Sequence, residues 1–372
     1  MIEGCRILVI GGGIGGLTAA IALRGRGAVV DVIERDPDWS VYGVGIIQQS
    51  NVVRAMKALD LLDDYLDAGF GFDEIFVFLP SGEPVATLKA PGLVEGYPAN
   101  VGIGRRALHK VLGDRTIGAG ATVRLGTTAT ALDDDGEGVD VAFSDGSRSR
   151  YDIVVGADGL YSQTRRMVFP EAPEPAFTGQ AVWRYNFARP ADLAGMHVYE
   201  GPIGVGLIPL SADLMYMYVT TPEPGNPRYP RHGLAATMRA KLAGMPPAIA
   251  ALAEQITDDD AVVYKPLEWL LLDGPWHKGR VVMLGDAVHA TTPHLGQGAG
   301  MAIEDSIVLA EELARAETPE AGFRAFRDRR YDRCLYIVRE SLALCRGQIG
   351  QGPRVEQGKA AHDMFAVTAA PI

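Results

Sequence analysis

Glycines near the N-terminus have the spacing of a phosphate-binding loop. Gly11, Gly13 and Gly16 satisfy the pattern G-x-G-x-x-G within the segment GGGIGG. The first glycine permits a tight turn, the second lets the backbone approach a pyrophosphate, and the third lets a helix pack closely on a strand. Glu34 lies 18 residues after Gly16, where an acidic side chain accepts hydrogen bonds from ribose hydroxyls. This combination predicts a dinucleotide site, and a strand–helix turn without a ligand is the competing interpretation.

A second polar loop, DGLYSQTR, follows the apolar segment IVVGA. Asp158 and Gly159 are turn formers, and Ser162 is a natural helix N-cap. Ordinary turn and cap chemistry explains these residues as well as a ligand site does. The motif by itself therefore leaves both interpretations open.

A third polar loop follows the apolar segment RVVML and contains GDAVH and GQG. Open α/β sheets bind ligands at the carboxyl ends of their strands, so we expect Asp286 to bond ligand hydroxyls. The backbone N–H groups of Gly296–Gly298 suit a flat or anionic ligand. For His289 we expect a hydrogen-bonded structural role rather than a catalytic one. Together the three loops predict one tightly held dinucleotide.

The elements around these loops indicate an α/β protein. We expect buried strands at residues 6–10, 29–34, 153–157 and 280–284. We expect helices at residues 15–23, 105–117, 298–314 and 323–344. Strands of mixed character at residues 180–188, 204–209 and 214–220 predict an inserted antiparallel sheet. The tail after Gly347 is rich in Gly and Gln, and we expect it to fray.

Composition excludes several classes of protein. The net charge is −11 and no run is basic, so nucleic acid is not an expected partner. Three scattered cysteines, Cys5, Cys334 and Cys345, do not make a disulfide framework or a zinc site, and no metal is expected. The uncharged stretch 7–23 is interrupted by glycines and is short for a membrane span. These features predict a soluble, cytoplasmic protein with no membrane span.

Taken together, the three motifs resemble those of the single-component (class A) flavoprotein aromatic monooxygenases. Salicylate, 4-hydroxybenzoate and 6-hydroxynicotinate hydroxylases belong to that family. GGGIGG…E, DGLYSQTR and GDAVHATTPHLGQGAGMAIED occur here in the family's order over roughly residues 5–345. Gly300 is a departure, because many relatives carry Asn there. The resemblance implies an α/β fold with a Rossmann-like FAD-binding domain of the hydroxybenzoate hydroxylase type, an inserted mixed or antiparallel β-sheet substrate domain, and C-terminal helices.

The implied domains are interleaved along the chain. A discontinuous FAD-binding domain would comprise residues 1–70, 100–175 and 275–347. The substrate-binding sheet domain would comprise residues 71–99 and 176–274. Residues 348–372 would form a C-terminal tail.

The resemblance also implies which residues hold a tight, non-covalent FAD. Gly11–Gly16 and Glu34 would bind the ADP part, Asp286 the ribitol and pyrophosphate region, and Pro293–Gly298 would face the isoalloxazine. Arg105 in IGRRAL matches the family's I-x-R-x-x-L arginine near the flavin phosphate. The full predicted set is Gly11, Gly13, Ile14, Gly15, Gly16, Glu34, Arg35, Arg105, Asp158, Gly159, Asp286, Pro293, Gly296, Gln297, Gly298 and Ala299. Asp158 and Gly159 would also serve transient NAD(P)H.

The activity implied by the resemblance is that of an FAD-dependent, NAD(P)H-consuming monooxygenase. It would hydroxylate a small hydroxylated aromatic or heteroaromatic acid with O₂ as co-substrate, through a flavin C4a-hydroperoxide. Such chemistry needs a dry site and a substrate hydroxyl that is deprotonated or hydrogen-bonded. The alternatives are a flavin oxidase, dehydrogenase or reductase of the same fold that makes no oxygenating intermediate, and a non-enzymatic nucleotide-binding protein. We expect a monomer or a homodimer.

No motif identifies a catalytic base. Pocket candidates are Gln48, Tyr185, Met215, Tyr216, Met217 and Pro293. Strand alternation sends Met215 and Met217 to one face and Tyr216 and Tyr218 to the other. One of these faces should cover the flavin, and the sequence does not say which. Sheet packing is the competing interpretation for each of these residues.

Overall fold

The computed structural model describes residues 2–372 and contains a central six-stranded sheet. The strands run in the order β18 (His277–Lys278), β19 (Val281–Met283), β12 (Ile153–Gly156), β1 (Arg6–Ile10), β2 (Val29–Glu34) and β8 (Thr122–Leu125). All neighbours are parallel except β18 and β19. The middle strands are continuous apolar runs because helices and a second sheet cover both faces.

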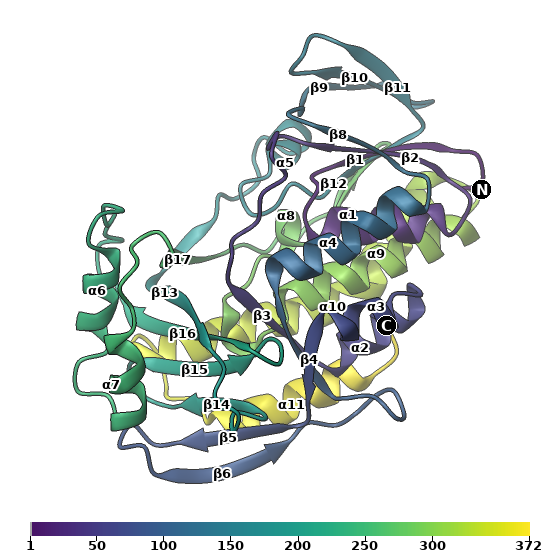
Figure 1. Cartoon of the computed structure of the whole chain (residues 1–372). Coiled ribbons are helices and arrows are strands. Elements are labelled where there is room, and N and C mark those ends of the chain that lie inside the picture. The colour runs from purple at the N-terminus through teal and green to yellow at the C-terminus, as the bar shows by residue number, and fades with distance from the viewer. Residues whose placement is uncertain (1) are drawn as a thin grey trace.

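Helices pack on one face of this sheet (Figure 1). They are α1 (Ile14–Arg24), α4 (Arg105–Gly118), α9 (Gly298–Arg315) and α10 (Pro319–Gln348). Helix α1 packs between α4 and α9, and the hydroxyls of Thr18 and Ser306 share a hydrogen bond of 2.8 Å across the α1–α9 contact. Helix α10 then packs on α9.

A small antiparallel sheet covers the other face. Its strands are β9 (Ala129–Asp134), β10 (Val139–Phe143) and β11 (Arg148–Tyr151), and the short helix α5 (Gln163–Val168) lies beside it. Leu8 and Ile33 of the central sheet pack there against Val141 and Phe143.

A seven-stranded sheet forms the second large unit. Its order is β17 (Val263–Trp269), β13 (Ala176–Ala188), β16 (Leu214–Pro222), β15 (Gly204–Pro209), β14 (Met196–Tyr199), β5 (Glu74–Phe78) and β6 (Pro84–Lys89). Only β14 and β5 pair in parallel. Helices α6 (Leu234–Lys241) and α7 (Pro247–Glu254) cover its outer face, where Trp183 packs with Met238 and Ile249.

Short elements join the two units. One is a three-stranded sheet of β3 (Gly45–Gln48), β7 (Asn100–Gly104) and β4 (Gly69–Phe72). Helices α2 (Ser50–Ala58) and α3 (Leu62–Asp67) share a hydrophobic cluster with β7. The single turns α8 (Asp286–His289) and η1 (Pro293–Leu295) lie in the loop after β19. Across residues 2–372, no helix combines the length and apolar character that a membrane span requires.

The C-terminal segment differs from the sequence prediction. It does not fray but forms helix α11 (Gln357–Ala369), which buries Ala360, Met364 and Thr368 at four-residue spacing. Arg54 donates hydrogen bonds to the carbonyls of Thr368, Ala369 and Ala370, and Arg333 donates to those of Ala370 and Pro371. Cationic side chains at the last carbonyls stabilise a helix end. The prediction failed because these partners come from distant parts of the chain.

Candidate active site

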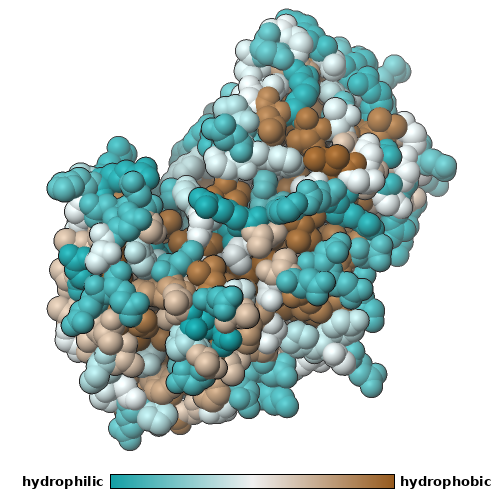
Figure 2. Space-filling view, in the orientation of Figure 1, coloured by the Kyte–Doolittle hydropathy of each residue, from teal (hydrophilic) through white to brown (hydrophobic). Residues whose placement is uncertain are grey.

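One cavity of about 950 Å³ connects the predicted loops to the seven-stranded sheet. It opens at the carboxyl ends of β1, β2, β12 and β19, where Gly13, Glu34, Gly159 and Asp286 line it. Figure 2 shows hydrophobic residues exposed in the recess between the part of the molecule that carries α6 and the part that carries β9–β11. Its volume is at the upper end for ligand pockets, as a dinucleotide would require.

The first glycine loop has the geometry that a pyrophosphate needs. Gly11 has φ of +110°, and a Cβ there would lie 2.4 Å from the carbonyl oxygen of Ala157. A Cβ on Gly16 would lie 1.8 Å from the carbonyl oxygen of Gly11, so this glycine allows α1 to pack against the turn. Gly13 has open space around its Cβ position and faces the cavity at the start of α1. The helix N-terminus therefore offers free N–H groups to an anion.

Glu34 and Arg35 line the cavity beside this loop. The two carboxylate oxygens of Glu34 accept hydrogen bonds from the backbone N–H groups of Gly12 at 2.8 Å and Asp36 at 2.9 Å. These bonds fix the side chain, and each oxygen keeps a further lone pair for a ligand hydroxyl.

In the second loop the two turn residues have different roles. Gly159 lines the cavity. Asp158 does not; its carboxylate accepts hydrogen bonds from the Ser162 hydroxyl, from the Thr164 N–H at 2.9 Å and from the Thr164 hydroxyl at 3.0 Å. Ser162 caps α5 by accepting from the Arg165 N–H, as its sequence position predicts. The carboxylate of Asp158 thus holds the start of α5, and the backbone of this loop faces the ligand space.

Arg165 connects the second loop to the third. Its buried guanidinium donates hydrogen bonds of 2.9 Å to the carbonyls of Leu160 and Ala287. Burial lowers the pKa of Arg165. This one side chain therefore fixes the second loop relative to the third.

Two charged side chains, Asp286 and Arg105, line the cavity, and the charge of each affects the pKa of the other. Burial raises the pKa of Asp286, although His289 and Arg105 oppose that shift. Burial also lowers the pKa of Arg105, whose guanidinium makes no hydrogen bond or ion pair within the described chain. A cation without a partner that lines the same cavity as the open N-terminus of α1 fits the phosphate of FAD.

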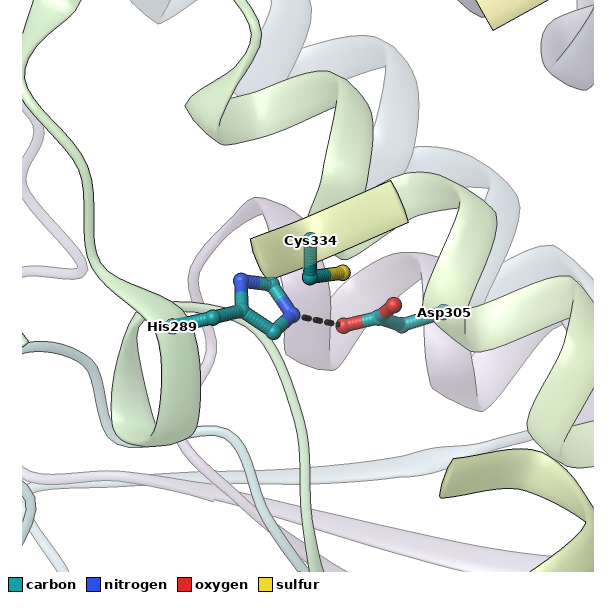
Figure 3. Close-up of side chains that lie close together, drawn as sticks. All are labelled: His289, Asp305 and Cys334. Atoms are coloured by element: carbon teal, nitrogen blue, oxygen red, sulfur yellow. Dashed lines mark hydrogen bonds and ion pairs between the residues drawn. The ribbon is translucent and has the colours of Figure 1, made fainter. Parts of the chain in front are cut away.

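Behind this loop lies a buried charged cluster (Figure 3). The Nε2 atom of His289 lies 2.6 Å from the Asp305 carboxylate, which also accepts from the N–H of Gly285 at 3.0 Å and from Arg330 at 2.8 Å. Burial opposes a charge on His289, but Cys334 and Asp305 raise its pKa well above the usual value. The role of His289 is therefore structural, as expected.

The same cluster has the residue types of a metal site, because the ligand atoms of His289, Asp305 and Cys334 lie within 4.8 Å of one another. The carboxylate, however, is already shared among His289, Gly285 and Arg330. Arg330 also pairs with Glu304 at 2.7 Å and supplies the positive charge that both buried carboxylates require. The cluster is a salt-bridge network that supports the third loop.

The remaining loop residues divide into two groups. Pro293, Gly296, Gly298 and Ala299 line the cavity, together with Ile14 and Gly15 of the first loop. Gln297 points away from it into a buried amide network with Gln49 and Asn51, in which its Nε2 donates to the Asn51 side-chain oxygen at 3.0 Å. Asn51 in turn donates to Glu304 at 3.1 Å. The side chain of Gln297 therefore anchors the loop, and the cofactor space is formed by its neighbours.

The face of the seven-stranded sheet toward the cavity carries Tyr216, Tyr218 and Arg184. Tyr185, Met215 and Met217 do not line it; they are buried in the core against α6 and α7. The sequence prediction is corrected for these three residues, because the period-two alternation puts them on the opposite face.

Gln48 also lies outside the cavity. It is buried in β3, and neither of its side-chain polar atoms has a hydrogen-bond partner within residues 2–372. Its neighbours Ile46, Ile47 and Gln49 line the cavity instead.

Several cavity residues were not among the predicted site residues. Arg184 makes no hydrogen bond or ion pair within the described chain, and burial and the charge of Arg105 lower its pKa to about 10. Alternation along β13 puts Arg184 on the face opposite to Tyr185, and its partner across the β13–β16 pair is Tyr218. His294 contacts Thr292 at 3.0 Å and Gln348 at 3.2 Å, and burial lowers its pKa to about 4. Met364 and Phe365 come from α11, which no sequence signal placed here.

Comparison with known proteins agrees with this arrangement. The family described as "FAD binding domain" matches residues 4–220 and 271–339. The chain is 32% identical over 361 residues to the aurachin C monooxygenase/isomerase of Stigmatella aurantiaca, covering 94% of this chain and 91% of that protein. It is 30% identical over 352 residues to an FAD-dependent urate hydroxylase of Klebsiella pneumoniae, covering 91% and 89%. The crystal structure of Klebsiella pneumoniae HpxO complexed with FAD and uric acid has a TM-score of 0.84 at 27% identity, covering 98% of this chain and 92% of that one. The chain therefore belongs to the FAD-binding family of flavoprotein monooxygenases.

Proposed function

We propose that this protein binds FAD, consumes NAD(P)H and O₂, and hydroxylates a small hydroxylated aromatic or heteroaromatic acid. The cofactor would be held by the open N-terminus of α1, by Glu34, by Arg105 and by Asp286, all of which line one cavity. Bound FAD, reduced by the nicotinamide, supplies the oxygen-transfer chemistry, and the protein supplies binding, orientation and dryness.

Arg184 is the observation that supports an acidic substrate. Its guanidinium faces the cavity without an anionic partner, and the charge of Arg105 repels it. An unpaired buried charge is costly, so an anion that enters the cavity gains a strong hydrogen-bonded pair. Arg35 and Lys265 also line the cavity, but Arg35 directly follows Glu34 in the nucleotide part and Lys265 lies over the ring of Tyr42. Since Arg105 fits the FAD phosphate, we assign Arg184 to the substrate carboxylate.

Two tyrosines support a hydroxylated ring. The hydroxyls of Tyr216 and Tyr218 are not hydrogen-bonded to any residue of the described chain, and both side chains line the cavity. Burial raises the pKa of both tyrosines, although Arg184 and Arg105 partly oppose this for Tyr216. Both hydroxyls therefore stay protonated at neutral pH and can donate to a substrate oxygen. A hydrogen bond to a phenolate oxygen holds the ring in its electron-rich form.

A screen of phenolic acids and hydroxypyridine carboxylates tests the proposal. The acids should accelerate NADH or NADPH oxidation by the purified yellow protein, and ¹⁸O₂ should label the product with one oxygen atom. Turnover that yields only H₂O₂ with every aromatic compound would favour the alternative, a flavin oxidase or dehydrogenase of this fold. A protein that releases no flavin on denaturation would contradict the proposal altogether.

Variants of Arg184 test the acid. Arg184→Met should raise KM for an aromatic acid roughly 10- to 100-fold, since a hydrogen bond to a charged group contributes about 1.5–3 kcal/mol. The matched carboxamide of the same ring should show nearly the same KM with both proteins. Arg184→Lys, which keeps the charge, should lie between them. Equal losses for the acid and the amide would contradict the assignment.

The location and assembly of the protein stay predictions. None of its three cysteines forms a disulfide within the described residues, as is usual in a reducing compartment, and this supports a cytoplasmic location. Light scattering would test the expected monomer or homodimer.

A further inference from the structure

The cavity extends well beyond the residues that fit FAD and the substrate acid. Its lining also includes Ile75 and Val77 of β5, Val198 of β14, and Ala361, Met364 and Phe365 of α11, and we refer to the space beside these six side chains as the distal compartment. Figure 1 shows α11 running beside the half of the sheet that carries β14 and β5. Helix α11 also contacts η1, and the Met364 sulfur accepts a hydrogen bond of 3.5 Å from Gln297. The compartment is thus adjacent to the flavin-facing loop.

The distance from Arg184 to this compartment follows from the strand order. Strand β5 is four positions from β13, which carries Arg184, because β16, β15 and β14 lie between them. At a strand spacing of about 4.8 Å, the two strands lie roughly 19 Å apart. A single ring held by Arg184 and the tyrosines would leave the far end of this span unfilled.

The character of the compartment restricts what fills it. All six side chains that define it are apolar, and Ile75 and Val77 are only 9% and 8% exposed. Glu200, which directly follows β14, also lines the cavity, and burial raises its pKa. A charged or strongly polar group would lose its hydration there without a partner, whereas an apolar group would gain from burial.

We infer that the distal compartment binds an apolar substituent of the substrate, and that α11 is the wall that sets its permitted length. The substrate is then an aromatic compound with an alkyl or similar chain remote from its polar end. The aromatic part of this inference rests on the proposed function. The apolar compartment does not, because its walls would favour an apolar group on any ligand that reaches them.

Binding of two homologous series tests the compartment without turnover. The probes are 4-alkylsalicylates and 4-alkylphenols with methyl, propyl and butyl chains, titrated calorimetrically into the purified protein with its flavin. From methyl to butyl, Kd should fall roughly tenfold or more in both series, since each buried methylene contributes up to about a fourfold gain. Only the salicylates should depend on Arg184.

Two tryptophan substitutions on α11 form a matched pair. Ala361→Trp fills the compartment, whereas Ala366→Trp adds the same side chain to the exposed side of the same helix. The first should abolish the gain with chain length and keep the methyl probes within about twofold of wild type; the second should retain the full gain. Phe365→Asn, which adds no bulk, should reduce the methyl-to-butyl ratio at least severalfold and so covers the case in which Ala361→Trp does not fold.

The outcomes separate the two proposals. Affinity that does not rise with chain length in either series, or a gain that survives both Ala361→Trp and Phe365→Asn, would overturn the distal compartment. A gain in both series with no preference for the acids would leave the compartment intact and count against Arg184 as the substrate anchor.

Discussion

Removal of the buried cation Arg330 is the most demanding test of how the third loop is supported. The side chains of Arg330, Glu304 and Asp305 are at most 1% exposed, and Arg330 pairs with the two carboxylates at 2.7 and 2.8 Å. Arg330→Met leaves both carboxylates without their central partner. Breaking a buried pair in this way costs about 3–5 kcal/mol.

That cost converts to a melting temperature through the entropy of unfolding. At about 2.1 cal/mol/K per residue, a chain of 372 residues has an unfolding entropy of about 0.8 kcal/mol/K, so Tm should fall by about 4–6 °C. Differential scanning calorimetry measures the shift. Flavin retention should fall with it, because Asp305 also accepts from the N–H of Gly285, the residue before Asp286.

Arg339→Met is the matched control. Arg339 is exposed on the same helix and forms no ion pair with another described residue, so its substitution should change stability by less than about 0.5 kcal/mol. If Arg330→Met melts within about 1 °C of wild type, the network does not support the loop, and the reasoning about its buried charges is wrong.

Four further substitutions follow from the geometry. Gly16→Ala should lower both the Tm and the amount of bound flavin, measured by its absorbance band, because the added Cβ would lie 1.8 Å from the Gly11 carbonyl oxygen. Gly13→Ala adds a Cβ with no atom within 4 Å, so the variant should lose flavin while the Tm of the flavin-free protein stays unchanged. Ser162→Ala should cost about 1 kcal/mol in denaturant unfolding through loss of the α5 cap, with an unchanged value contradicting that role. Burial lowers the pKa of His294 to about 4, so the unfolded chain takes up a proton first as pH falls below about 6.5 and stability is lost toward pH 4. His294→Gln should remove this loss, gaining about 2–3 kcal/mol relative to wild type between pH 7 and 4.5 in the free energy of unfolding, and parallel pH curves would refute the assignment.

The nucleotide side of the site could be predicted from the sequence because its signals are local. Gly11 needs a positive φ and Gly16 needs the absence of a Cβ, and both requirements are set by residues within one strand–turn–helix unit. The buried strands at residues 6–10 and 29–34 were predicted with their observed bounds for the same reason. An apolar run between turn residues can be recognised as a strand without knowing which strands it pairs with.

The substrate side was decided only by tertiary structure. Strand alternation predicts that Met215 and Tyr216 lie on opposite faces of the sheet. Which face lines the cavity depends on α6 and α7, which come later in the chain and cover the Met215 face. Asp158 and Gln297 occupy positions of the sequence motifs, but their side chains are hydrogen-bonded to Thr164 and Asn51 rather than directed at the cavity. The spacing of the motifs does not predict these contacts.

Helix α11 shows the same limit most clearly. By composition its segment predicted a frayed tail, and Arg54 and Arg333 become its partners only after α2 and α10 have folded around it. The sequence by itself determined a flavin-dependent family and the loops that would hold the cofactor. Only the tertiary structure decided which side chains enclose the substrate, because those come from strands and helices whose shared surface exists only in the folded chain.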